Sequence, residues 1–261
     1  MKIYVNGLSV IGPGLHDTQS AQTILRGEKH WHYETMPSLK PAMLPANERR
    51  RTTSLIKLSL EAMQDLLRDN DGLNSLSSVF ASAYGDLDIA DKMCSALAAR
   101  EKVISPTVFH NSVHNAPAGY WSIAASLRGA STSISAGDAT FMVGLMEAVT
   151  RLMTEHNVVL YVAYDYPGPE RINARLPLAY PLAIALRLGS TPEPGVFGTL
   201  TLKGEADKPL TRCRNISLDP LREGMPTGAG LPLIEALCRR ARMEVDIPYL
   251  ADKTYSVIVS H

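Results

Sequence analysis

The sequence has few cysteines and no excess of either charge, and both absences narrow its possible functions. Its three cysteines, Cys94, Cys213 and Cys238, stand far apart with no CxxC pair, which argues against a disulfide framework and against a thiolate metal site. Lys plus Arg and Asp plus Glu each number 26, so nothing in the composition favours a nucleic-acid or membrane-surface partner. Neutral ligands and other protein surfaces fit this balance better.

Long hydrophobic runs are also missing. The N-terminal stretch MKIYVNGLSVIGPG is interrupted by Asn6, Gly7 and Gly12 before the apolar core of a signal peptide could form. No later stretch approaches the length of a membrane span. The glycine-rich turns at residues 12–14 and 228–230 form neither a GxGxxG fingerprint nor a P-loop. We therefore expect a cytoplasmic protein without membrane contact and without a nucleotide or other cofactor.

What is present is the composition of a globular protein with a substantial core, 45% hydrophobic and 20% charged. Helical and strand-like patterns alternate along the chain, which predicts an α/β layered protein. We expect strands at residues 3–11, 78–84, 130–136, 158–163, 180–188, 198–203 and 254–259, and helices at 17–26, 53–68, 89–100, 118–127, 140–153 and 232–242. Seven prolines from Pro167 to Pro209 predict a surface excursion or a linker in the middle of the chain.

Four stretches resemble the β-ketoacyl synthases, in the order that the family has them. The opening IYVNGLSVIGPGLHD, followed by LRGEKHW, resembles the family's first strand, turn and helix. The stretch SVHNAPAGYWSIAASLRGASTSISAGDATFMVGLMEAV resembles the interface segment, helix and strand that lead to the nucleophile and its helix. VVLYVAYD is similar to the strand after that helix, and TGAGLPL is similar to the first histidine loop, HGTGTPL. Four ordered matches carry more weight than any single motif.

The resemblance implies a site that has lost its catalytic groups. A ketosynthase holds the acyl chain on a cysteine thiolate at a helix N-terminus and uses histidines to polarise a malonyl-derived carbonyl. Asp138 stands where the cysteine would be, and Thr227 stands where the first histidine would be. The second histidine loop has no match. Because an aspartate cannot form the acyl thioester, we expect no ketosynthase activity from this chain alone.

The same resemblance implies a thiolase-like layered α-β-α sandwich with a truncated second half. The chain is shorter than a complete ketosynthase, and the missing material falls after Asp165. We therefore expect a ketosynthase-like N-terminal half at residues 1–165 and a shortened C-terminal half at residues 166–261 that completes the layers.

Three functions follow from the resemblance. The first is a non-catalytic chain length factor, as in type II polyketide or aryl polyene biosynthesis, whose partners would be an active ketosynthase subunit, in a heterodimer or larger heteromer, and an acyl carrier protein. The second is a stand-alone hydrolase or decarboxylase of acyl thioesters. The third is a degenerate scaffold that only stabilises a biosynthetic assembly.

The family resemblance places residues 106–115 at the subunit interface, beside the tunnel that holds the growing chain. Bulky side chains there could end the tunnel by steric exclusion, although core packing and a loop with internally bonded histidines are the alternatives. The tunnel and interface candidates are Phe109, His110, Val113, His114, Asn115, Phe141 and Met142. His110 and His114 are four residues apart, but a metal site would need a third ligand that the pattern does not supply.

Two further features have a simple and a sharper interpretation. Asp138 suits a helix N-cap, and it could instead be a residual acid that aids decarboxylation of a malonyl group. Arg49, Arg50 and Arg51 suit a solvated surface at a helix start, and they could instead contact an acidic, phosphopantetheine-bearing carrier protein.

Overall fold

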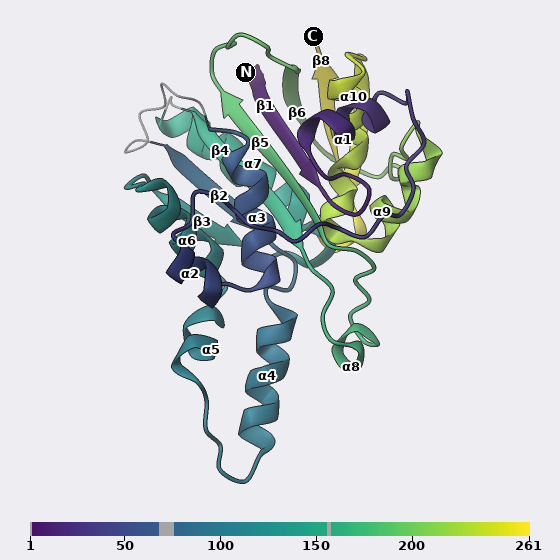
Figure 1. Cartoon of the computed structure of the whole chain (residues 1–261). Helices are drawn as coiled ribbons and strands as arrows, with labels where there is room; N and C mark the ends of the chain where they lie inside the picture. Colours follow the sequence, from purple (N-terminus) through teal and green to yellow (C-terminus); the bar gives the residue numbers. More distant parts are fainter. Residues whose placement is uncertain (1, 68–75, 156–157) are drawn as a thin grey trace.

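One mixed sheet of eight strands organises the chain. The computed structural model describes residues 2–67, 76–155 and 158–261, and its strands are ordered β3-β2-β4-β5-β1-β6-β8-β7 (Figure 1). The strands are β1 (Ile3–Ile11), β2 (Ser77–Ala81), β3 (Ser131–Ile134), β4 (Val159–Asp165), β5 (Leu182–Gly189), β6 (Gly198–Ala206), β7 (Met243–Pro248) and β8 (Thr254–Ser260). Strands β3, β2 and β4 are parallel, and the remaining pairings are antiparallel.

Helices cover this sheet on both faces. The helices are α1 (Thr18–Leu25), α2 (Ala46–Arg51), α3 (Ser54–Gln64), α4 (Leu87–Ala98), α5 (Pro106–Asn111), α6 (Ala116–Ala125), α7 (Thr140–Glu155), α8 (Glu170–Asn173), α9 (Asp219–Gly224) and α10 (Leu231–Cys238). One apolar cluster joins the sheet to α1, α7 and α10, and a second joins strands β1, β2, β4 and β5 to α3 and α6. The expected α-β-α layering is therefore confirmed.

The interpretation of the proline-rich middle as a surface excursion or a linker is wrong, whereas the strands expected there at residues 180–188 and 198–203 are confirmed as β5 and β6. Strand β5 lies in that stretch, is buried along its whole length, and pairs with β4 on one side and β1 on the other. Strand β6 follows it and pairs with β1 and β8. The prolines precede or separate these strands and none interrupts them, so every amide of β5 remains available to the ladder.

Other boundaries differ from the expectation where elements are short. The helix expected to end at Arg68 ends as α3 at Gln64, and Arg68 lies outside the described residues. The sequence pattern did not predict β7 at the sheet edge. It also did not predict the six-residue helices α2, α5 and α9, because such short helices carry almost no periodicity. Helices α4 and α5 with their connecting loop, residues 87–111, project away from the sheet (Figure 1), and we call them the arm.

The 3₁₀ turn Pro226–Gly230, which leads into α10, lies so close to α7 that only glycine fits at position 230. A Cβ atom on Gly230 would lie 2.2 Å from Cε2 and 2.3 Å from Cζ of Phe141. The Phe141 ring cannot yield, because it is fully buried and packs edge-on against Tyr161, whose hydroxyl donates to the Phe141 carbonyl oxygen at 2.6 Å. This contact fixes the start of α10 against the start of α7.

We expect Gly230→Ala to lower the free energy of unfolding by about 1–3 kcal/mol, because the added methyl group must displace a buried ring. Gly119→Ala in α6 is the matched control, since nothing lies within 4 Å of its Cβ position. That control should raise the free energy of unfolding by about 0.5–1 kcal/mol. Urea unfolding measures both, and equal effects of the two substitutions would contradict the close contact.

Candidate functional site

The turn between β3 and α7 presents Asp138 to solvent. Gly137 adopts a left-handed conformation, with φ of 55°, and the 3₁₀ turn Gly137–Ala139 leads directly into α7. The expectation that Asp138 caps the helix is wrong, since its exposed carboxylate accepts no hydrogen bond from the described residues. The hydroxyl of Thr140 holds the turn instead, accepting from the Ala136 amide at 2.9 Å and donating to the Gly137 carbonyl at 2.6 Å.

Thr227 is buried and bound to the carboxylate of Asp165. Its hydroxyl donates to Asp165 Oδ2 at 2.6 Å. Asp165 Oδ1 accepts from the Ser82 hydroxyl at 3.1 Å and from the Ala83 amide at 2.8 Å. The carboxylate therefore joins the ends of β2 and β4 to the 3₁₀ turn Pro226–Gly230 that precedes α10. Sequence reasoning missed this role of Asp165, although an acidic residue at the end of a fully apolar strand was a usable signal.

Burial dominates the electrostatics of this cluster. It raises the pKa of Asp165 to about 6, against an ordinary value of 3.8, although the hydrogen bonds from Thr227, Ala83 and Ser82 favour the ionised form. Burial also raises the pKa of Tyr84, and the carboxylates of Asp138 and Asp165 add to that rise. At neutral pH the buried carboxyl of Asp165 is therefore mainly ionised, and it accepts hydrogen bonds from Ser82, Ala83 and Thr227.

A cleft of about 790 Å³ opens beside Asp138, a volume typical of small-molecule sites. Tyr84 and Asp138 contribute to its wall together with Leu178, Met225 and Tyr249. The three basic side chains at the cleft, Lys208, Arg222 and Lys253, all have acidic partners. The cleft therefore combines an apolar wall with two carboxylates, Asp138 and Asp252, that have no partner among the described residues.

None of the three cysteines offers a thiolate to this cleft. Burial raises the pKa of Cys213 well above its ordinary value and raises the pKa of Cys238 to about 12, so both remain neutral thiols. Cys94 is exposed on α4, in the arm. The three do not line the cleft.

The structure does not bring the seven tunnel and interface candidates together. Phe109, His110, Val113 and Asn115 are exposed in or directly after the arm. Phe141 and Met142 are fully buried in the core on the α7 face of the sheet. His114 is half-buried, with Nε2 at 3.1 Å from the Ser82 carbonyl oxygen. The ring of His110 packs edge-on against Tyr120.

Asn111, which sequence reasoning did not single out, holds the arm to the body. This buried amide donates from Nδ2 to the Arg51 carbonyl oxygen at 2.7 Å and accepts from the Tyr120 hydroxyl at 3.1 Å. A second cleft, of about 610 Å³, lies at this junction and is lined by Arg51, Leu87 and Val108 among others. The segment expected at the interface therefore borders a cleft, although through Val108 and Asn111 and not through Phe109.

The three arginines of α2 differ in their environments. Arg49 is half-buried and donates to the Leu44 carbonyl oxygen at 3.2 Å, whereas Arg51 lies 3.6 Å from Glu48. Arg50 is exposed and has no partner among the described residues. Arg50 is therefore the member of the cluster whose charge is free to meet another molecule.

The described part of the chain holds no group of three or more histidine, cysteine, aspartate or glutamate residues placed to bind a metal ion. Within the same residues, no helix is both long and apolar enough to cross a bilayer.

Comparison with known proteins identifies the fold. Residues 23–215, which include Asp138 but not Thr227, match the family model for the N-terminal domain of beta-ketoacyl synthases. A chain in the complex of the ketosynthase ApeO with its chain length factor ApeC from Xenorhabdus doucetiae is 23% identical, with a TM-score of 0.77 and 99% coverage of both chains. No curated protein matches the chain significantly by sequence.

Two further solved structures share the fold at full length. A chain of the AntDE:AntF complex, a type II polyketide ketosynthase with its acyl-carrier protein, is 13% identical with a TM-score of 0.73 and 99% coverage of both chains. A chain of the ishigamide ketosynthase/chain length factor is 12% identical with a TM-score of 0.72 and the same coverage. The expected thiolase-like fold is thus confirmed.

We expect Asp165→Asn to change how stability depends on pH. Because the folded-state pKa of Asp165 is raised to about 6, its contribution to stability is complete below about pH 4 and is lost as the pH rises through 6. The free energy of unfolding of the wild type, relative to Asp165→Asn, should therefore fall by about 2–3 kcal/mol between pH 4 and pH 7. Urea unfolding at several pH values measures this difference.

Asp207→Asn is the control for this comparison, since its side chain is 88% exposed. Its difference from the wild type should vary much less across the same pH range. A pH-independent difference for Asp165→Asn would show that the carboxyl does not titrate within the folded protein.

Proposed function

The chain belongs to the beta-ketoacyl synthase family, and on that premise we propose that it is a chain length factor: a non-catalytic subunit that pairs with an active ketosynthase and limits the length of the chain that the partner makes. The single observation that carries the proposal is the exposed arm beside a site without a thiolate. A ketosynthase fold that lacks its nucleophile but presents apolar surface is suited to assembly and not to acyl transfer.

The chemistry of the site supports a non-catalytic role. Asp138 stands at the start of α7, where the family resemblance places the acyl-accepting cysteine, and a carboxylate there cannot form a thioester. The Thr227 hydroxyl is engaged by the buried Asp165 and cannot replace the histidine expected at that position. Both groups that the reaction would need are thus replaced by side chains that serve the fold or face solvent.

The arm supports a protein partner. Leu97 is 52% exposed, Val103 is 72% exposed and Phe109 is 63% exposed, and the arm that carries all three projects from the body of the protein (Figure 1). Apolar side chains gathered on a projecting element are typical of a surface that another protein covers. Strand β3 adds an unpaired sheet edge, which a partner's strand could extend. An acyl carrier protein, the second proposed partner, would meet the free charge of Arg50.

We expect Phe109→Asp to weaken the complex with an active partner ketosynthase by at least tenfold, because it places a charge in an apolar contact. Ile216→Asp is the matched control, since Ile216 is 76% exposed and lies in the 3₁₀ turn Ile216–Leu218 directly before α9, a helix that lies away from the arm (Figure 1). Co-purification and biolayer interferometry of the two proteins measure the effect.

A monodisperse monomer that never binds the ketosynthase would contradict the proposal. If the purified chain alone instead turned over acyl or malonyl thioesters, and Asp138→Ala abolished that turnover, the stand-alone hydrolase or decarboxylase would be the better assignment.

We expect Phe109→Ala to shift the products of the reconstituted ketosynthase complex towards longer chains. A smaller side chain would leave more room at the end of the tunnel that holds the growing chain. Phe141→Ala should instead destabilise the chain by about 3–5 kcal/mol, since Phe141 is fully buried in the core. Mass spectrometry of carrier-bound products compares the variants, with Ile216→Ala as the control. An unchanged length distribution with altered yield would favour a scaffold that only stabilises the assembly.

A further inference from the structure

Four arginines line one groove on the surface formed by the ends of α1 and α10. The groove has a volume of about 560 Å³ and is lined by Arg26, Arg214, Cys238, Arg239, Arg240 and Ala241. No acidic side chain is among these residues. Because the whole chain has a formal charge of +0, this groove is a local concentration of positive charge and does not reflect a generally basic protein.

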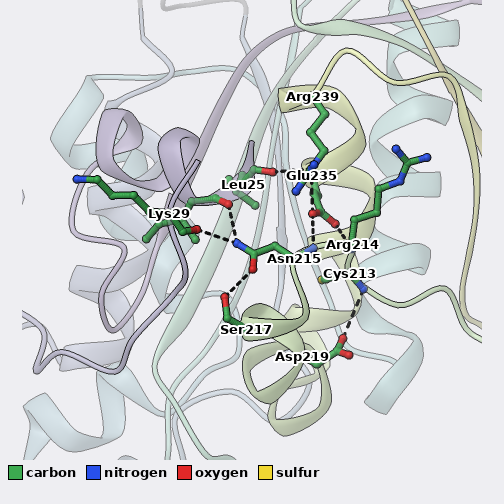
Figure 2. Close-up of polar contacts among 10 residues, drawn as sticks. Leu25, Lys29, Cys213, Arg214, Asn215, Ser217, Asp219, Glu235 and Arg239 are labelled. Carbon is green, nitrogen blue, oxygen red and sulfur yellow. Dashed lines mark hydrogen bonds and ion pairs between the residues drawn. The ribbon is translucent and has the colours of Figure 1, made fainter. Parts of the chain in front are cut away.

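A buried carboxylate outside the groove lining fixes the segments that form the groove. Glu235 of α10 is 2% exposed and accepts from the Arg214 amide at 2.6 Å, the Asn215 amide at 2.7 Å and Arg239 Nε at 3.0 Å (Figure 2). Arg239 also donates to the Leu25 carbonyl oxygen at 3.2 Å, which ties α10 to the end of α1. The groove is therefore a fixed feature of the fold.

The remaining guanidinium groups are available to a ligand. The side chain of Arg214 points away from Glu235 (Figure 2), and its guanidinium has no partner among the described residues. The side chain of Arg240 likewise has no partner among the described residues. Arg26 is held loosely, by Gln22 Oε1 at 3.1 Å and by Glu28 at 4.0 Å. Two free guanidinium groups and a third weakly paired one thus remain at one hollow.

Arg240 adopts a left-handed backbone conformation directly after α10. Helix α10 ends in a Schellman motif, in which the Arg240 amide donates to the Leu237 carbonyl at 3.2 Å and the Ala241 amide donates to the Ala236 carbonyl at 3.0 Å. The residue at this position must be left-handed, and Arg240 has φ of 50°. Glycine is the favoured residue there, and a charged side chain costs conformational energy. Such strain is typical of positions kept for a function.

We propose that this groove binds a phosphate group carried by a small ligand. Guanidinium groups match the geometry and charge of phosphate oxygens through paired hydrogen bonds, and several arginines gathered at one open groove favour a compact dianion. Cys238 takes no part as a nucleophile, because burial raises the pKa of its thiol to about 12. The proposal does not depend on pairing with a ketosynthase, since the groove uses neither the arm nor the cleft at Asp138.

Isothermal titration of the full chain with pyrophosphate tests the site. Arg214→Gln should weaken binding about tenfold or more, because charged hydrogen bonds to the ligand are lost. Arg240→Gly should weaken binding similarly while raising the melting temperature by about 2 °C, because glycine relieves the left-handed backbone. Arg128→Gln is the control: Arg128 is exposed and has no partner among the described residues, but lies between α6 and β3, away from the groove.

A folded wild type that gives no heat with pyrophosphate would overturn the proposal. Equal weakening by Arg128→Gln would do the same, since it would show general charge attraction. An Arg240→Gly protein that is more stable and binds with unchanged affinity would remove Arg240 from the site and overturn the argument from strain. Co-sedimentation with phosphatidylcholine vesicles containing phosphatidic acid, sensitive to Arg214→Gln, would assign the same chemistry to a lipid headgroup; its absence beside pyrophosphate binding would assign it to a soluble ligand.

Discussion

The buried carboxylate of Asp165 is the constraint on which the arrangement of the site depends. It closes the end of β4 and draws two other segments to the same point, the end of β2, from which the chain enters the arm, and the turn before α10. An unpaired charge in this position would cost several kcal/mol, so the three donors must stay in place together. One carboxylate therefore sets both the position of the segment that leads from β2 into the arm and the position of Thr227.

A second constraint acts on the opposite side of the same turn. The absence of a side chain at Gly230 lets α10 start directly against Phe141. Because α10 is buried along its whole length, this approach also sets where the helix ends. Its end carries Arg239 and Arg240, and its middle carries Glu235, which fixes the backbone of Arg214. The arginine groove is thus positioned by the packing that brings α10 close to α7.

The sequence predicted the layers and most of the long elements, because β-branched strands and amphipathic helices such as α7 carry clear periodicity. It predicted the strand at residues 180–188 that forms β5, but it wrongly took the surrounding proline-rich stretch for a surface excursion or a linker, because the prolines occupy the flanks of the strand. Sequence reasoning also grouped Phe141 with Phe109 as tunnel candidates, since both are aromatic and lie in or close to the stretch that resembles the β-ketoacyl synthases. Only the tertiary structure shows that one is in the core and the other is 63% exposed.

The contacts that define the candidate site were hidden for a related reason. Asn111 reaches the Arg51 carbonyl across 60 residues of sequence, and Asp165 reaches Thr227 across 62. Periodicity reports the face on which a side chain lies and not the distant backbone that it meets. The family resemblance supplied the positions of Asp138 and Thr227, but their separate environments, one exposed and one buried, came from packing.

The distribution of satisfied and unsatisfied polar groups separates the regions of this protein by role. At Thr227, where the sequence resemblance implies a histidine, the hydroxyl donates to the buried Asp165 carboxylate. Where the arm and the groove meet solvent, Phe109, Arg214 and Arg240 have exposed surface or charge without an internal use, and Arg240 keeps it at a conformational cost. The Thr227 hydroxyl is occupied by an internal hydrogen bond, whereas the exposed side chains of the arm and the groove remain available to another molecule. This distribution supports the proposed role in binding.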